Sequence, residues 1–195
     1  MTSKRAVLTG EVVDLPNNTP QSSRHLSAHI ELGLRLLHDY VPFSYDVFRG
    51  KHFVIETAQA RHALDIAMLL RLFLKSKQQQ DDWDVRIGVG LTEDLSNQAL
   101  ASLKKDRLMV LTGSPGTDDR FRLTTKFADT LLSQLTSTQA QVLSYYLRFM
   151  PITHQDLADK LNKSRVNVTQ ILNSTHYKLF ELYLKEAQTL LGASK

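Results

Sequence analysis

The hydrophobic pattern of this chain changes near residue 125 of 195. Before that point, short apolar runs typical of strands alternate with stretches that have the spacing of amphipathic helices. After it, every patterned stretch is helical. This order indicates an α+β chain, with a mixed domain at 1–124 and an all-α domain at 125–195. The second domain is expected to open with a helical connector, because residues 125–137 contain neither Gly nor Pro.

The first 124 residues predict a sheet covered by helices. Strands are expected at 6–13, 44–48, 53–55 and 83–90, helices at 23–37 and 58–74, and further short strands at 108–111 and 121–123. The order β-α-β-β-α-β, plus extra strands, is the split arrangement of the ferredoxin-like fold, in which helices cover one face of an antiparallel sheet. Gly88 and Gly90 within one of these strands indicate a close approach of another backbone segment.

The later residues predict helices at 126–135 and 139–149, two short helices after Pro151, and a long helix at 176–191. The two short helices form the clearest motif. Thr153 and Ser164 are placed to cap their N-termini, and Asn162 can end the first helix in a left-handed conformation. Ala158 is small where two steeply crossing helices come closest.

This motif resembles the helix-turn-helix of many bacterial regulators and of sigma-factor-like modules, over about residues 138–180. The spacing depends on the apolar residues Leu157, Ala158, Leu161, Val168 and Ile171. On the second helix we expect Val168 and Ile171 to face inward. The residue types left outside are those that grip phosphates or read base edges, and acids are absent among them. The candidate DNA-binding residues are Lys163, Ser164, Arg165, Asn167, Thr169, Gln170 and Asn173.

Basic charge gathers in the same part of the chain. The net charge is +4, and residues 138–195 hold 7 Lys and Arg against 4 Asp and Glu. No acid occurs between Asp159 and Glu181. Such a cluster suits a polyanion, because attraction to phosphates is the sequence-independent part of nucleic-acid affinity. A solvated basic face and a helical hairpin for protein contacts are the alternatives.

Three short stretches stand out in the N-terminal part: residues 8–13 (LTGEVV), 48–53 (FRGKHF) and 84–90 (DVRIGVG). Together they resemble the SatD family, and the resemblance extends over nearly the whole chain. The resemblance implies a domain related to class III nucleotidyl cyclases, followed by a helix-turn-helix. In active cyclases of this fold, two carboxylates hold the metal ions that bind a triphosphate. Glu11 stands at the first of these places, but Lys51 stands at the second, where its ammonium would repel a cation.

We therefore expect no metal-dependent cyclase activity, no metal and no cofactor. The residues Glu11, Arg49, Lys51 and His52 could instead bind an anion such as a nucleotide phosphate. His25 and His29 are four residues apart but lack a third ligand, so they do not predict a zinc site.

Three features of the sequence bear on where in the cell the protein is expected to be. The chain has no Cys, no apolar run of the about 18 residues that a membrane span needs, and no pattern of a signal peptide at its start. We expect a cytoplasmic protein that does not bind a membrane.

The leading interpretation is a DNA-binding transcriptional regulator, expected to form a homodimer, because one recognition helix reads only a few base pairs. Its N-terminal domain would be a degenerate cyclase-like sensor or dimerisation domain, and one sheet face could supply the interface. A nucleotide could act as effector. The alternatives are a nucleotide-processing enzyme that uses Glu11 and Asp14, and an adaptor for a protein partner.

Overall fold

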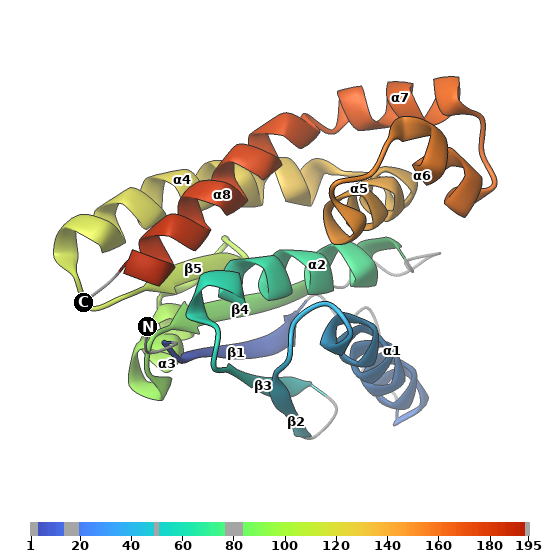
Figure 1. Cartoon of the computed structure of the whole chain (residues 1–195). Coiled ribbons are helices and arrows are strands. Elements are labelled where there is room, and N and C mark those ends of the chain that lie inside the picture. The colour runs from blue at the N-terminus through green and yellow to red at the C-terminus, as the bar shows by residue number, and fades with distance from the viewer. Residues whose placement is uncertain (1–3, 14–19, 49–50, 77–83, 194–195) are drawn as a thin grey trace.

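The computed structural model describes residues 4–13, 20–48, 51–76 and 84–193 (Figure 1). The N-terminal part contains β1 (Ala6–Val13), α1 (Pro20–His38), β2 (Ser44–Phe48), β3 (His52–Thr57), a 3-10 turn η1 (Ala60–His62), α2 (Ala63–Ser76), β4 (Asp84–Gly90), α3 (Glu93–Ser102) and β5 (Leu108–Leu111). The helices α4 (Pro115–Gln134), α5 (Ser137–Phe149), α6 (His154–Leu161), α7 (Arg165–Ser174) and α8 (Tyr177–Ala193) follow. The chain is α+β, as the sequence predicts.

The five strands form one sheet in the order β2-β3-β1-β4-β5. Along β2-β3-β1-β4 each strand is antiparallel to its neighbours, and Leu8 of β1 pairs with Ile55 of β3 and Val89 of β4. This is the predicted split β-α-β arrangement of a ferredoxin-like sheet. Strand β5 adds to it in parallel beside β4.

Strand β4 shows why the two faces of the sheet differ. Val85, Ile87 and Val89 alternate onto the buried face, which α1 and α2 cover. Gly88 and Gly90 lie on the other face, where α3 packs so closely that a Cβ on Gly88 would lie 2.3 Å from a backbone carbonyl oxygen of α3. The predicted close backbone approach is confirmed, and α3 is the element that makes it.

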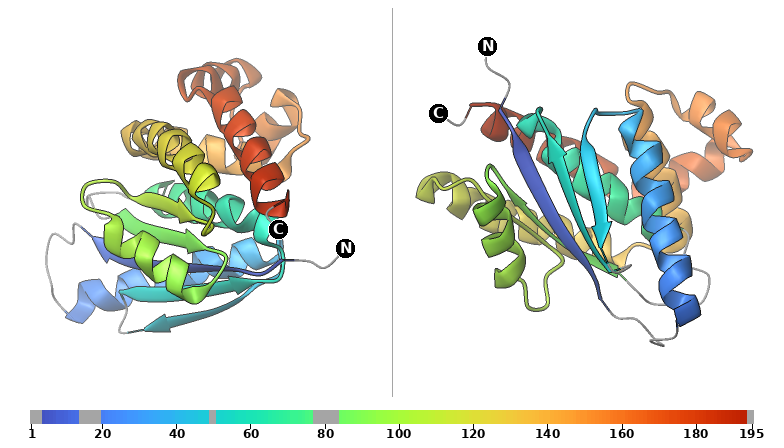
Figure 2. Two further views of the ribbon diagram at one scale, coloured as in Figure 1. Left: turned by 90° about the vertical axis from the view of Figure 1, so that its left-hand side faces the viewer. Right: turned by 90° about the horizontal axis from the view of Figure 1, so that it is seen from below.

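Helix α2 lies between the sheet and the later helices (Figures 1 and 2). Its buried residues cover the whole circumference instead of one stripe, as expected for a helix that is covered on all sides. The main hydrophobic core therefore runs from the sheet through α2 into α4, α5 and α8. The division of the chain at residue 124 stays a prediction, and helix α4 passes through that position.

One expected strand is absent from the described residues, and one helix was missed. Residues 121–123 form no strand but lie inside α4, where Phe121 is buried and Leu123 is exposed. Gly113, at φ 81°, and Pro115, in the first turn, set the start of this helix well before residue 126. Helix α3 was also not expected, although Thr92 accepts a hydrogen bond from the backbone N–H of Leu95 in the manner of an N-cap.

Within the part of the chain that the structure describes, none of the helices combines the length and the apolar character that crossing a membrane requires.

Candidate nucleic-acid interface

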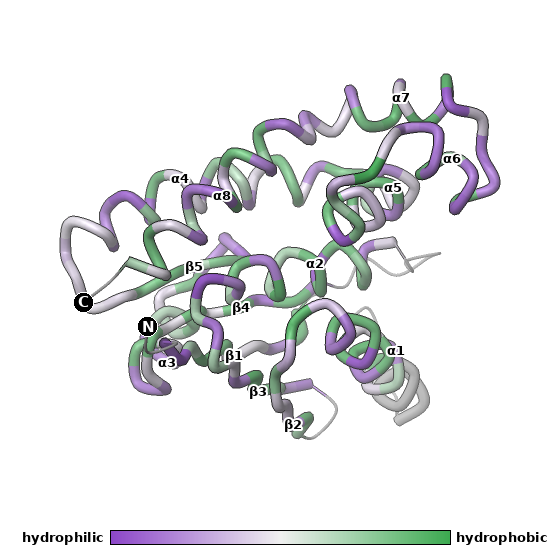
Figure 3. The backbone as a smooth tube through the Cα atoms, viewed as in Figure 1, coloured by the Kyte–Doolittle hydropathy of each residue, from purple (hydrophilic) through white to green (hydrophobic). Residues whose placement is uncertain are grey.

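Helices α6 and α7 are joined by a tight turn, and three polar residues cap the ends of these helices. Thr153 Oγ1 accepts a hydrogen bond of 3.1 Å from the backbone N–H of Asp156 at the start of α6. Asn162 ends α6 in the left-handed region, at φ 51° and ψ 49°. Ser164 Oγ then accepts a hydrogen bond of 3.2 Å from the backbone N–H of Asn167 at the start of α7. The predicted caps are confirmed, and the turn between the two helices is hydrophilic (Figure 3).

The inner faces of α6 and α7 meet α5 in a small core of their own. Its fully buried members are Val142, Leu157, Ala158, Val168 and Leu172. Ala158 is small at the point where α6 and α7 cross, as predicted. On α7, Leu172 takes the buried place that the sequence assigned to Ile171, which is only half-buried against the same cluster. The motif is thus a three-helix unit that holds α7 by one side.

Aromatic rings and one part-buried hydrogen bond tie this unit to α8. The ring of Tyr146 packs edge-on against Tyr177 and His154, at centroid distances of 5.0 and 6.4 Å. The hydroxyl of Tyr146 donates a hydrogen bond to the carboxylate of Glu181 in α8. Burial raises the pKa of Tyr146, and the adjacent Glu181 raises it further, so the phenol stays a donor. These contacts hold α5 to the first turns of α8.

Most of the predicted DNA-binding residues are exposed, either on the side of α7 opposite its buried residues or at its N-terminus. The exposed ones are Ser164, Arg165, Asn167, Gln170 and Asn173. Lys163 and Thr169 are half-buried, and Thr169 Oγ1 lies 2.9 Å from Nδ1 of His154 in α6. Asn167, Gln170 and Asn173, each three residues apart, thus share the side opposite Val168 and Leu172, while Ser164 and Arg165 are exposed at the N-terminus of α7. The Thr169 hydroxyl is turned toward the neighbouring helix.

One residue of this surface was missed from the sequence. Val166 is 66% exposed, although it is a large apolar residue near the N-terminus of α7. It falls between Arg165 and Asn167, outside the positions that pack on α5 and α6. A branched apolar side chain at such a place can contact the methyl group of thymine in the major groove. The available signal was its position two residues before the inward-facing Val168, which is nearly opposite on a helix.

The described residues of the N-terminal part do not cover the outward surface of α7. Helix α7 lies at the edge of the molecule, away from the sheet (Figure 1), and packs against α5, α6 and α8. The stretch of chain free of acids, from Lys160 to Phe180, includes all of α7. An exposed helix face with this chemistry can enter a groove of duplex DNA without rearrangement of the fold.

The candidate anion-binding residues in the N-terminal part are only partly assembled. The register of β1 places Glu11 opposite His52 on one side and Arg86 on the other. Arg86 Nη2 lies 2.5 Å from Glu11 Oε1, and His52 Nδ1 lies 4.0 Å from Glu11 Oε2. Lys51 directly precedes His52, the first residue of β3, and its backbone carbonyl accepts a hydrogen bond from the backbone N–H of Val12.

The carboxylate of Glu11 is thus neutralised by Arg86, a partner that the sequence did not suggest. Arg49 and Asp14 lie outside the described residues, and so does the side chain of His25. Among the residues that are described, no three His, Asp or Glu side chains come together as a metal ion would need.

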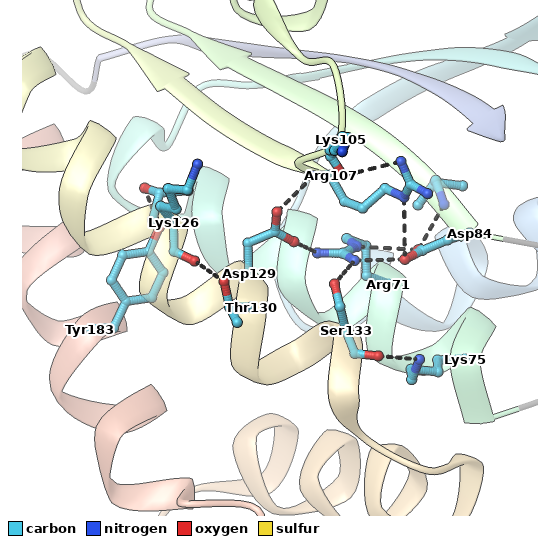
Figure 4. Close-up of polar contacts among 12 residues, drawn as sticks. Arg71, Lys75, Asp84, Lys105, Arg107, Lys126, Asp129, Thr130, Ser133 and Tyr183 are labelled. Atoms are coloured by element: carbon cyan, nitrogen blue, oxygen red, sulfur yellow. Dashed lines mark hydrogen bonds and ion pairs between the residues drawn. The ribbon is translucent and has the colours of Figure 1, made fainter. Parts of the chain in front are cut away.

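A buried ion network, which sequence reasoning missed, joins the sheet to the later helices (Figure 4). Arg71 of α2 is fully buried, and its guanidinium contacts Asp84 Oδ2 at 2.7 Å and Asp129 Oδ1 at 2.5 Å. Asp129 of α4 also accepts a hydrogen bond of 2.7 Å from the backbone N–H of Arg107. Ser133 Oγ takes a further N–H of Arg71. These residues come from α2, β4, the segment before β5 and α4, so the network fixes α4 onto the sheet.

Burial alone would lower the pKa of Arg71 and raise that of Asp84. The ion pairs and hydrogen bonds outweigh burial, so the pKa of Arg71 lies above its usual value and that of Asp84 below. Both groups therefore stay charged, and the network acts as a structural clamp.

A capped tight turn, a three-helix core and an exposed acid-free second helix define a helix-turn-helix module of the DNA-binding class. Residues 131–181 match the family model of sigma-70, region 4. The match begins within α4 and continues through α5, α6 and α7 into α8. No curated protein matches the chain. The match supports a DNA-binding regulator in general terms.

Proposed function

We propose that this protein is a transcriptional regulator that places α7 in the major groove of duplex DNA. The observation that carries this function is the outward face of α7, which is exposed, polar and free of acids. It belongs to a helix-turn-helix that matches sigma-70, region 4. A face that served only for solubility would usually carry acids as well as bases.

Each residue of this face has a role that follows from its chemistry. Arg165 can donate two hydrogen bonds to guanine, and Gln170 can pair in the same way with adenine. Asn167 and Asn173 extend the polar row along α7, and Val166 offers an apolar contact to thymine. Lys163 and Ser164 precede the helix and are suited to phosphate contacts, which set the register of the protein on the duplex.

The N-terminal domain, in this view, is a catalytically inactive relative of nucleotidyl cyclases, as its resemblance to the SatD family implies. It would serve as a sensor or as part of a homodimer. The ion pair between Glu11 and Arg86 supports the absence of catalytic activity, because a carboxylate already neutralised by a guanidinium is a poor ligand for a metal ion. Lys51 adds a positive charge to the same end of the strands.

Selection of bound sequences from a random duplex library by the purified full chain tests the DNA-binding function. We expect a single enriched motif, and an affinity for it that falls steeply as salt rises, because the phosphate contacts release counterions. The control is a library of single-stranded sequences of the same length. Recovery of no motif, with weak retention at about 0.2 M salt, would contradict DNA binding and favour a protein partner.

Incubation of the purified chain with nucleoside triphosphates and Mn²⁺ tests the inactive state of the N-terminal domain. We expect no cyclic or diphosphate product, because the second carboxylate of a two-metal site is replaced by Lys51. A matched variant, Glu11→Gln, should behave like the natural chain. Product formation that disappears in Glu11→Gln would show instead that the domain processes nucleotides.

A further inference from the structure

We infer that the outer face of α4 and α8 is the homodimer interface of this protein, occupied by the same face of a second copy. Four large apolar side chains stand out from these two helices. Leu123 and Phe127 of α4 are 62% and 66% exposed, and Leu179 and Leu182 of α8 are 53% and 64% exposed. Apolar side chains this large and this exposed, gathered in one place, mark an interaction surface.

On each of the two helices, the exposed apolar pair lies on the side away from the buried residues. Within each helix they are four and three residues apart, so they share a face. Two contacts set the alignment of the helices, since Arg120 pairs with Glu186 at 2.5 Å and Thr125 Oγ1 lies 2.8 Å from the hydroxyl of Tyr183.

From Arg120 to Thr125 the residue number rises along α4, whereas from Glu186 to Tyr183 it falls along α8. The helices are antiparallel and side by side, as Figures 1 and 2 also show. Phe127, just beyond Thr125, is level with the first turns of α8, where Leu179 and Leu182 lie.

The residues on the opposite sides of both helices fill the core, so the apolar face points away from the molecule. Buried residues of α4 are Phe121, Thr125, Ala128, Asp129 and Leu132, and those of α8 are Phe180, Leu184, Ala187 and Leu191. The face has room for a specific contact. With about 1.5 Å of rise per residue and a diameter of about 10 Å, the pair presents a face about 25 Å long and about 20 Å wide. This projected area of about 500 Å² is somewhat below the about 600–1,000 Å² per partner of a standard stable interface.

Charge complementarity identifies the occupant as a second copy. Consider a two-fold axis that runs lengthwise between α4 and α8. It lays α4 of each copy on α8 of the other and closes an antiparallel four-helix bundle. Phe127 then meets Leu179 and Leu182 across the axis. Because Arg120 and Glu186 are level with each other, Arg120 of each copy also meets Glu186 of the other, and the four charges alternate in sign.

The same axis suits the proposed DNA contact. Helix α8 begins directly after α7, so both copies carry their helix-turn-helix at the same end of the bundle. Two recognition helices related by a two-fold axis match the two half-sites of a palindromic duplex. This step depends on the proposed function, whereas the dimer itself does not.

The sheet offers a competing surface. Phe48 of β2 is 50% exposed and lies on the face that α1 and α2 do not cover, beside the Glu11–Arg86 ion pair. A dimer that formed through the sheet would need Phe48, whereas a dimer through the helices would need Phe127. Substitution of each by Glu therefore separates the two surfaces.

Sedimentation velocity on the full chain, over a range of concentrations, gives the mass. We expect twice the 22.1 kDa of one chain. The variant Phe127→Glu should dissociate at least about 100-fold more readily, because each dimer loses two central apolar contacts. The variant Phe48→Glu should stay dimeric. A monomeric natural chain, or loss of the dimer in Phe48→Glu but not in Phe127→Glu, would overturn the assignment.

A charge-reversal mixture tests the axis itself. Alone, Arg120→Glu and Glu186→Arg should each weaken the dimer, because like charges then meet across the interface. Mixed together, the two variants should form a heterodimer in preference to either homodimer. A mixture that forms no heterodimer would contradict this arrangement. Should the dimer form while no duplex is bound, the interface would stand and the proposed DNA binding would fail.

Discussion

Substitution of Arg71 by leucine should lower the free energy of unfolding by about 3–5 kcal/mol, the largest effect that we expect of any single change in this chain. The side chain is fully buried, and its removal leaves the buried carboxylate of Asp129 without its cation and Asp84 with only the longer contact of 4.0 Å to Arg107 Nε. A buried charge without a partner costs several kcal/mol, whereas leucine restores only part of the packing. Urea unfolding followed by circular dichroism measures the difference.

The control for this experiment is Arg35→Leu, which removes an exposed guanidinium that pairs with Glu31 one helical turn away. An exposed pair of this kind contributes little, so the change should stay within about 0.5 kcal/mol of the natural chain. Equal effects of the two substitutions would show that the network around Arg71 does not clamp α4 to the sheet.

Acid provides a second readout of the same network. Burial alone would raise the pKa of Asp84, but the contacts with Arg71 hold it below the usual value. A carboxyl group with a lowered pKa in the folded state stabilises the fold above its unfolded pKa, and this contribution is lost as the pH falls through the folded value. The natural chain should therefore lose stability below about pH 4 more steeply than Arg71→Leu does.

The sheet was predictable because its strands carry local signals. Alternation along 84–90 identifies the buried face of β4, and Gly88 and Gly90 announce the close approach of α3. The helix that makes this approach was missed, since its apolar residues are few and its start depends on the single cap at Thr92. The error at 121–123 has a similar cause, because three residues are too short to distinguish a strand from one turn of a helix.

Long-range packing accounts for most of what the sequence did not reveal. In the sequence, helix α2 shows one apolar stripe. Its other side is apolar as well and is covered by α5 and α8, which begin more than 60 residues after α2 ends. Arg71, Asp84 and Asp129 are likewise ordinary charged residues in the sequence. Only the fold brings α2, β4 and α4 together and buries them.

The helix-turn-helix was predictable in more detail because short-range geometry determines it. The caps at Thr153 and Ser164, the left-handed Asn162 and the small Ala158 all have the predicted roles. The errors concern the faces of α7, where Leu172 replaces Ile171 inside, Thr169 turns toward α6 and the exposed Val166 was missed. A shift of one residue is about 100° on a helix, so the edges of a face are the least certain part of such a prediction.

The double variant Arg165→Ala with Gln170→Ala should lose at least about 2 kcal/mol of binding free energy for the selected duplex, which is at least about 30-fold in affinity. Each side chain can make a two-point contact with a base, and alanine makes none. Both residues are exposed, so the thermal unfolding of the variant should match that of the natural chain. Fluorescence anisotropy with the selected duplex and with an unrelated duplex measures the two affinities.

The loss should be larger for the selected duplex than for the unrelated one, because base contacts give specificity and phosphate contacts do not. The matched control, Arg35→Ala with Gln98→Ala, removes the same two residue types from exposed positions on α1 and α3. It has the same net charge as the test variant, so a general effect of charge would appear in both. Equal losses in the two variants, or natural affinity in both single variants of α7, would mean that another surface reads the DNA. A loss confined to the α7 variant would locate base recognition on this helix, since charge, residue type and folding are then held constant.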